Sequence, residues 1–216
     1  MNHLLTVADA VAAHARLQPH KIGARDSRRS LSFAQWHERA SRLANGLLAL
    51  GLEKGDRVAL LAYNCVEWME IYVALARVGL VAVPINFRLT APEICYIASH
   101  CEARAFIAQQ ELLDRVDAIR ADLKIAPQAY VCIGAGAAVG WQDYEALIAA
   151  AGTDAPAEAV RPRRCLRADV HLGHHRPAQG CHPQPPGQHA DSARHRARNG
   201  LHPRGHRAAG DADVPR

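Results

Sequence analysis

Residues 57–84 read RVALLAYNCVEWMEIYVALARVGLVAVP, and this stretch decides the fold class. It begins with a run at 57–62 that is apolar after its first residue, and it ends with a second apolar run at 80–84. An unbroken apolar run of this length is typical of a strand that is buried on both faces, as the strands of parallel sheets are. The stretch therefore predicts a strand, a connecting helix and a second strand, which together make one βαβ unit.

The segment between the two apolar runs has the spacing of an amphipathic helix. Four residues recur at helical intervals and are expected on its buried face: Met69, Tyr72, Val73 and Ala76. Asn64 is expected to cap the start of this helix, because its side-chain oxygen can accept from the free backbone amides there. Gly79 is expected to end the helix.

The same alternation of helices and strands continues on both sides of this unit. Further strands are expected at 22–25, around Leu31, at 105–108 and at 129–133. Further helices are expected after the capping residues Thr6, Ser32 and Thr90, and around 111–123. Because helices alternate with short apolar strands, the fold class is α/β with βαβ units and a mostly parallel sheet.

The composition of the chain changes at Pro162. Residues 163–216 contain no Phe, Ile, Met, Trp, Tyr, Lys, Thr or Glu, and consist mostly of Arg, His, Ala, Gly and Pro. Such a segment cannot bury enough apolar surface to offset the entropy lost when it is ordered. We therefore expect two parts, a folded portion at 1–162 and a disordered tail at 163–216.

The charge of the chain divides at the same point. The whole chain has a formal net charge of +5, which alone would favour an anionic partner such as nucleic acid. The tail holds 10 Arg and 4 Asp, whereas the first 162 residues hold 16 basic and 17 acidic residues. The folded portion is therefore nearly neutral, which argues against a nucleic-acid-binding domain within it.

The six cysteines show neither CxxC pairs nor a regular spacing. Cys65, Cys95 and Cys132 stand among apolar residues, where a free thiol behaves as a small hydrophobic side chain. The first residues lack the basic and apolar regions of a signal peptide, and no apolar run is long enough to span a bilayer. These features predict a reduced, cytoplasmic protein without a membrane span.

Several stretches of the folded portion stand in the order and at the spacing of one enzyme family. They are LSFAQW at 31–36, ANGLLALGL at 44–52, VPINFRL at 83–89, the segments 55–61, 74–79 and 93–97, and Asn64 with Glu67. Together they resemble the N-terminal third of the AMP-forming acyl-CoA synthetases, in the adenylate-forming ligase superfamily. The resemblance covers about residues 5–162, and it implies that residues 1–162 are the N-terminal portion of an AMP-binding (adenylation) domain.

The resemblance also implies an activity. Enzymes of this family join a carboxylic acid to ATP, which gives an acyl adenylate and pyrophosphate, and then transfer the acyl group to CoA, with Mg²⁺ on the phosphates. Residues 83–93 look most like those of the fatty-acid or aromatic-acid CoA ligases. The segment 83–89 lies near the active-site cleft in the family, so Asn86 and Arg88 are candidates for contact with a substrate or CoA. No catalytic residue is expected in this chain.

The phosphate-binding loop of the family, a segment rich in Thr, Ser and Gly, should follow soon after residue 162. In its place stands DVHLGHHR at 169–176. This octapeptide can be back-translated into DNA that reads Met-Tyr-Thr-Ser-Gly-Thr-Thr-Gly when it is shifted by one nucleotide. In the same frame, residues 177–180 can supply Pro-Pro-Lys-Gly, and residues 211–216 can supply Met-Pro-Met-Tyr-His, another segment expected of the family. We therefore interpret residues 163–216 as a frameshifted translation.

This interpretation predicts that the polypeptide itself is inactive. In this reading frame the polypeptide lacks the phosphate loop, the later segments that hold adenine and ribose, and the C-terminal domain that bears the lysine of the family. No cofactor is expected to bind this chain, although the intact family uses ATP, Mg²⁺ and CoA. Strand edges that later sequence would cover are expected to promote aggregation.

The tail has an alternative interpretation as a binding module. Six of its residues are of the types that ligate soft metal ions, namely Cys165, His171, His174, His175, Cys181 and His182. Their spacing fits no closed zinc site, and the Arg-rich tail lacks the interleaved aromatic residues of a single-strand binder. No metal site and no specific nucleic-acid partner are therefore expected. On the alternative reading, the protein is non-catalytic, with a basic His/Arg-rich tail that binds nucleic acid or metal.

Overall fold

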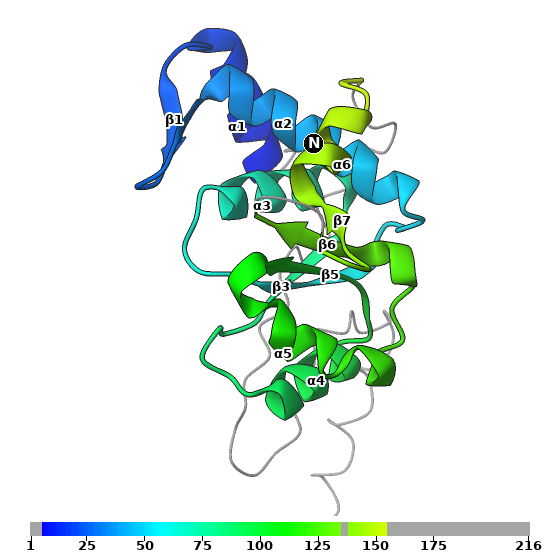
Figure 1. Ribbon diagram of the computed structural model, residues 1–216. Helices are drawn as coiled ribbons and strands as arrows, with labels where there is room; N and C mark the ends of the chain where they lie inside the picture. The colour runs from blue at the N-terminus through cyan, green and yellow to red at the C-terminus, as the bar shows by residue number, and fades with distance from the viewer. Residues whose placement is uncertain (1–5, 135–137, 155–216) are drawn as a thin grey trace, which may run out of the picture. The chain divides into compact units, whose positions relative to one another are not determined.

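A computed structural model describes residues 6–134 and 138–154 of the chain. Its central sheet contains five parallel strands in the order β4-β3-β5-β6-β7 (Figure 1). The strands are β3 (Arg57–Leu61), β4 (Val81–Pro84), β5 (Ala103–Gln109), β6 (Tyr130–Ile133) and β7 (Gln142–Asp143). The stretch 57–84 forms β3, α3 (Glu67–Val78) and β4, so the predicted βαβ unit and the α/β fold class are confirmed.

The other elements precede the sheet or connect its strands. Before it come α1 (Val7–Leu17), the antiparallel hairpin of β1 (Ile22–Arg25) and β2 (Ser30–Ser32), and α2 (Phe33–Ala49). After β4 come α4 (Ala91–His100), the 3-10 turns η1 (Gln110–Leu112), η2 (Arg120–Asp122) and η3 (Pro127–Ala129), α5 (Leu113–Asp117) and finally α6 (Tyr144–Ala150). Thr6, Ser32 and Thr90 each cap a helix in a capping box, as predicted.

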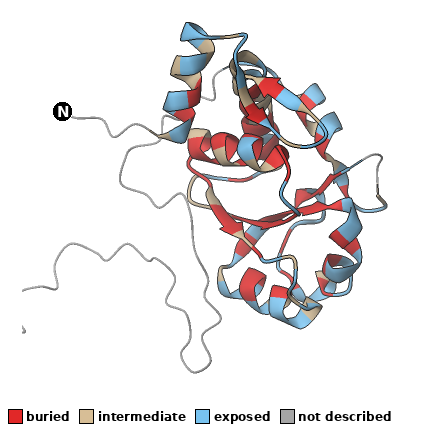
Figure 2. Ribbon diagram, turned by 90° about the vertical axis from the view of Figure 1, so that its left-hand side faces the viewer, coloured by how far each residue is buried: buried red, intermediate tan, exposed pale blue. Residues whose placement is uncertain are grey.

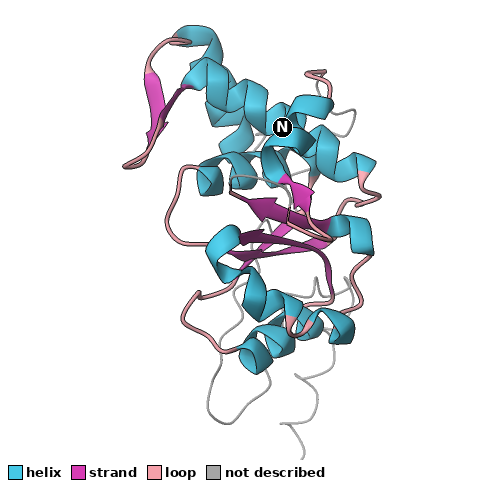
Figure 3. Cartoon of the chain, viewed as in Figure 1, coloured by secondary structure: helices cyan, strands magenta, loops and turns pink. Residues whose placement is uncertain are grey.

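Helices cover both faces of the sheet, which explains why most residues of β3, β4 and β6 are apolar. In Figures 1 and 3, α3 lies on one face with α1, α2 and α6 beyond it, and α4 and α5 lie on the other. Val58 of β3 pairs with Ala82 of β4 and Ala105 of β5. Every residue from Val58 to Leu61 is at most 1% exposed, so β3 is the centre of the core.

One buried carboxylate joins the helical layer above the sheet. Glu70 of α3 has no exposed side-chain surface, and Arg39 of α2 donates to both of its oxygens. Arg29 of the hairpin donates to Glu70 Oε2 at 3.2 Å, and the Tyr144 hydroxyl of α6 donates to the same oxygen at 2.8 Å. Burial and the neighbouring Glu70 carboxylate raise the pKa of Tyr144, so this hydroxyl stays a neutral donor. We call these four residues the Glu70 cluster.

Asp26, in the turn of the hairpin, links the hairpin to the start of α3. Its Oδ1 accepts from the amides of Arg28 and Arg29, each at 2.8 Å, and its Oδ2 accepts from the amide of Val66 at 3.0 Å. These bonds favour the ionised carboxyl and lower the pKa of Asp26 to about 2. The prediction that Asn64 caps α3 was wrong, because Val66 is the N-cap residue of this helix and no side chain makes a capping hydrogen bond there.

The structure differs from the sequence-based expectations at three further places. Met69 is 42% exposed rather than buried, although Val73 and Ala76 face the core as predicted. The helix expected around 111–123 is broken into η1, α5 and η2. Arg120, the first residue of η2, stacks on the Tyr130 ring at 3.9 Å and donates to the Gly140 carbonyl. The elements β7 and α6 were not expected at all.

Two further expectations concern the tail and the membrane, and the described residues bear only on the second. The boundary at Pro162 and the disordered tail at 163–216 lie outside the described residues. Among the helices within the described ranges, none combines the length and the apolar character that a membrane crossing requires.

Replacing Glu70 by Gln is expected to lower the free energy of unfolding by about 3 kcal/mol, because Arg29 and Arg39 lose a buried partner. The matched control is Glu38→Gln, which removes the exposed i,i+4 pair with Arg42 and should cost less than about 0.5 kcal/mol. Urea denaturation of both variants measures the difference. Equal losses for the two variants would show that the Glu70 cluster does not join the helical layer.

Replacing Asp26 by Asn is expected to destabilise the chain at neutral pH, but not in strong acid. The lowered pKa means that the carboxylate contributes its full stabilisation above the ordinary value of 3.8, and that this contribution is lost as the pH falls towards 2. Urea midpoints of wild type and Asp26→Asn should therefore converge between about pH 4 and pH 2. A gap between the midpoints that stays constant over this range would contradict the assigned hydrogen bonds.

Candidate ligand-binding edge of the sheet

The topology of the sheet singles out one edge for ligand binding. All strands are parallel, so their carboxyl ends lie at the same edge, on the left of Figure 1 and towards the viewer in Figure 2. From β3 the chain passes to β4 on one side and then returns to β5 on the other side of β3. Open α/β sheets bind ligands outside the carboxyl ends of their strands at such a reversal of order. We call the loops that follow β3, β4, β5 and β6 at this edge the carboxyl edge.

Gln109 ties the two strands at the reversal together. It is the last residue of β5 and one of four buried polar or charged residues in the described part of the chain, with 6% of its surface exposed. Its side-chain oxygen accepts from the amide of Tyr63, in the loop after β3, at 2.9 Å. This bond satisfies a backbone donor that the end of β3 leaves free, and it fixes the direction of that loop.

The loop after β4 carries both of the residues predicted to contact a ligand. Asn86 and Arg88 are exposed at the carboxyl edge, and the Asn86 side-chain oxygen accepts from the Arg88 amide at 3.0 Å. The Arg88 guanidinium lies 5.7 Å from the centroid of the Phe87 ring. The structure thus places the two residues together, with Asn86 shaping the turn and Arg88 presenting a charge to solvent.

This loop is held by contacts that the sequence did not reveal. The Phe87 ring meets the Tyr63 ring edge to face at 4.9 Å, which joins the loops after β3 and β4. Arg115 of α5 donates to the carbonyl of Phe87, and also to that of Leu89 at 3.2 Å. Sequence reasoning missed Tyr63, Gln109 and Arg115. One signal for Gln109 was available, since a polar residue directly follows the apolar run at 105–108.

Two arginines lie at the carboxyl edge. Arg88 and Arg115 supply positive charge, which suits an anionic ligand. The nearby cysteines are not nucleophiles, because burial raises the pKa of Cys65 to about 12 and that of Cys132 to about 11. Residues 6–134 and 138–154 contain no group of His, Cys, Asp and Glu side chains that would hold a metal ion.

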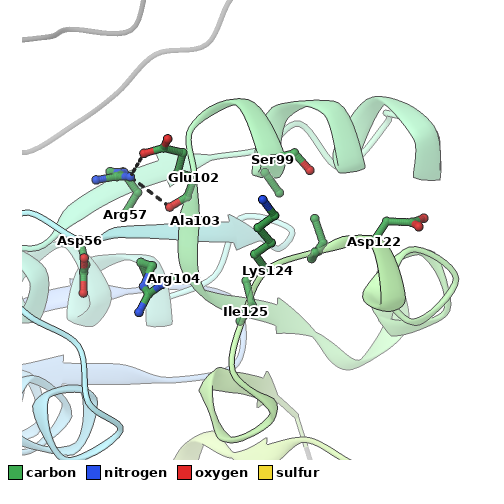
Figure 4. Close-up of a pocket in the computed structure, with 11 residues that line it drawn as sticks. Asp56, Arg57, Ser99, Glu102, Ala103, Arg104, Asp122, Lys124 and Ile125 are labelled. Atoms are coloured by element: carbon green, nitrogen blue, oxygen red, sulfur yellow. Dashed lines mark hydrogen bonds and ion pairs between the residues drawn. The ribbon is translucent and has the colours of Figure 1, made fainter.

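A recess of about 570 Å³ lies at the opposite, amino edge of the sheet (Figure 4). Its lining includes three cationic side chains and three carboxylates: Arg57, Arg104, Lys124, Asp56, Glu102 and Asp122. Arg57 donates to the Glu102 carboxylate at 2.6 Å and to the Cys101 carbonyl at 2.7 Å, so its charge is already paired. Because the lining is balanced in charge, the recess selects neither anions nor cations.

Comparison with known proteins gives one family. The family described as AMP-binding enzyme matches residues 11–187. The long-chain-fatty-acid–CoA ligase FadD13 of Mycobacterium tuberculosis is 43% identical over 106 residues, which are 49% of this chain and 21% of that protein. The indoleacetate–CoA ligase of Aromatoleum aromaticum is 32% identical over 152 residues, which are 70% of this chain and 29% of that protein. The chain thus spans less than a third of the curated relatives it matches.

Solved structures show the same likeness. The anthranilate CoA ligase AuaEII, in complex with anthranoyl-AMP, superposes with a TM-score of 0.77 at 26% identity, over 83% of this chain and 35% of that one. The N-terminal domain of FACL13 from Mycobacterium tuberculosis superposes with a TM-score of 0.66 at 29% identity, over 81% of this chain and 42% of that domain.

Replacing Gln109 by Leu is expected to release the loop after β3, because the Tyr63 amide loses its acceptor. A lost hydrogen bond of this kind costs about 1 kcal/mol, so hydrogen exchange at the Tyr63 amide should become about fivefold faster. The exposed Gln128, replaced by Leu, is the control and should leave exchange at Tyr63 unchanged. Unchanged exchange in both variants would remove Gln109 as the residue that fixes this loop.

Proposed function

This chain belongs to the AMP-binding enzyme family, and we propose that it is the N-terminal part of a ligase that couples a fatty or aromatic carboxylic acid to CoA. The observation that carries the proposal is which enzymes the chain is similar to. Ligases for long-chain fatty acids, ferulate and indoleacetate all match it with a sequence identity of 32% or more. The location of Asn86 and Arg88 at the carboxyl edge supports it, since the ligands of open α/β sheets bind there.

The proposed reaction has two steps. An oxygen of the carboxylic acid attacks the α-phosphorus of ATP, the bond to the β-phosphate oxygen breaks, and pyrophosphate leaves. The thiolate of CoA then attacks the carbonyl carbon of the acyl adenylate, and AMP leaves. Mg²⁺ supplies charge neutralisation on the phosphates when it is bound. In this proposal, Arg88 and Asn86 contact the substrate or CoA, and Gln109 and Arg115 hold the loops that carry the contacts.

We further propose that the polypeptide of these 216 residues does not catalyse the reaction. The octapeptide at 169–176 stands where the family's phosphate loop is expected, and DNA that could encode it reads as a sequence of the required kind when it is shifted by one nucleotide. In such a loop, backbone amides surround the phosphates. The octapeptide, with its Asp, His and Arg residues, does not reproduce a loop of this kind. The family match extends to residue 187, and the contrary interpretation is that the tail is therefore in frame.

Pyrophosphate release from ATP, measured with a panel of fatty and aromatic acids and with CoA, tests both parts of the proposal. The purified chain is expected to release none above background. A gene repaired by one nucleotide near the Pro162 codon, with its downstream sequence present, is expected to encode an enzyme that turns over. Turnover by the unrepaired chain would refute its inactivity. A folded product of the repaired gene that is inactive with every acid would refute the assigned ligase function.

A further inference from the structure

A histidine and an arginine meet between two helices of the layer above the sheet. The Nη2 atom of Arg77, in the last turn of α3, lies 2.9 Å from the Nδ1 atom of His37 in α2. Both side chains are half-buried, and the Nε atom of Arg77 is buried completely. We call these two residues the His37–Arg77 pair. It joins helices whose contact residues lie 40 positions apart in the chain.

The chemistry of the two side chains fixes the direction of this hydrogen bond. A guanidinium carries only donors and stays protonated in proteins, so Arg77 donates and the Nδ1 atom of His37 accepts. Nδ1 can accept only when the imidazole is neutral and its proton is on Nε2. The contact therefore requires an uncharged His37, because protonation would place an N–H group opposite another donor.

The surroundings of the pair oppose protonation of the histidine. Burial, the charge of Arg77 and the charge of Arg16 in α1 all lower the pKa of His37. Asp9, also in α1, favours the charged form of Arg77. Its carboxylate already accepts from the amide and the hydroxyl of Thr6, at 2.9 Å and 2.8 Å. Helix α1 thus adds a second cation near His37, and its one carboxylate is engaged elsewhere.

The other elements that pack against α2 do not supply a counter-charge for His37. The charged side chains that α6, the hairpin and α3 bring to α2 form one network around Arg39, namely Glu145, Arg29 and Glu70. Arg39 follows His37 by two residues, and residues two apart on a helix do not face each other. His14 of α1 stacks on the ring of the first residue of α2 at 4.7 Å, and it gains a positive charge when it titrates.

We propose that the His37–Arg77 pair is a pH-sensitive contact, which holds α2 on α3 near neutral pH and opens when His37 is protonated. In acid the imidazolium can no longer accept from Arg77, and the two cations repel each other at short range. Because Arg16 adds a third cation, the repulsion is relieved when His37 moves towards water. The helical layer above the sheet therefore loosens over the pH range in which His37 titrates. This inference goes beyond the proposed function and does not depend on it.

Urea denaturation of the full 216-residue chain between about pH 8 and about pH 5 tests the proposal. Because the pKa of His37 in the folded chain lies below the ordinary value of 6.5, the unfolded chain binds this proton more readily. The contact therefore contributes its full stabilisation above pH 6.5 and loses it as the pH falls below that value. The expected loss is up to about tenfold in the folding equilibrium constant for each pH unit.

The decisive variant is His37→Asn, which keeps an acceptor oxygen near the position of Nδ1 but does not titrate. Its urea midpoint should lie close to that of the wild type at about pH 8 and above it at about pH 5. The control is His20→Asn, in the exposed turn after α1, which should keep the same gap from the wild type at both pH values. A gap for His37→Asn that does not change with pH, or that changes equally for His20→Asn, would overturn the proposal.

An NMR titration of the histidine rings gives a second test that does not require His37→Asn to fold. The ring of His37 should titrate below pH 6.5 in the wild-type chain and closer to 6.5 in Arg77→Met, because one of the two opposing cations is removed. Methionine retains an apolar stem in the place of the arginine stem. Titration of His37 at or above 6.5 in the wild type, or an unchanged midpoint in Arg77→Met, would contradict the pH-sensitive contact.

Discussion

The described part of the chain depends on one buried carboxylate, that of Glu70. Burying a carboxylate away from water raises the free energy of the folded state unless partners neutralise its charge and donate hydrogen bonds to its oxygens. Here the partners are Arg29, Arg39 and Tyr144, which come from the hairpin, α2 and α6. Because each partner belongs to a different element, the carboxylate is satisfied in one arrangement of the helical layer only. The same hairpin fixes the start of α3 through Asp26, and thereby the loop that carries Tyr63.

Contacts between the elements also fix the loops at the carboxyl edge. Tyr63 is held from three directions, by the side chain of Gln109, the ring of Phe87 and the indole of Trp68. Arg115 fixes the neighbouring loop in the same way, so Arg88 projects from a defined position. We propose that these loops form part of a ligand site, to which Arg88 and Arg115 add positive charge. The groups that would break and form bonds are proposed to come from later sequence of the family.

The sequence predicted those features whose cause is local. Unbroken apolar runs indicated β3 and β4, and the capping residues indicated the starts of α1, α2 and α4. Features with a distant cause were missed. Asp26 of the hairpin accepts from the Val66 amide just before α3, and Arg120 contacts Tyr130 and Gly140 where the sequence predicted a continuous helix. At the candidate site, Asn86 and Arg88 were predicted through a family resemblance, whereas the contacts of Gln109 and Arg115 join residues far apart in the chain and could not be predicted from the sequence.

The central claim is that a family sequence continues, out of frame, beyond Pro162. It explains why both the composition and the charge of the chain change at that residue. Sequencing the coding DNA from the Pro162 codon through the following kilobase tests it most directly. The account predicts a single shifted frame that reads Met-Tyr-Thr-Ser-Gly-Thr-Thr-Gly at the codons for 169–176 and stays open downstream. A shifted frame that lacks this motif, or that is interrupted by stop codons, would contradict it.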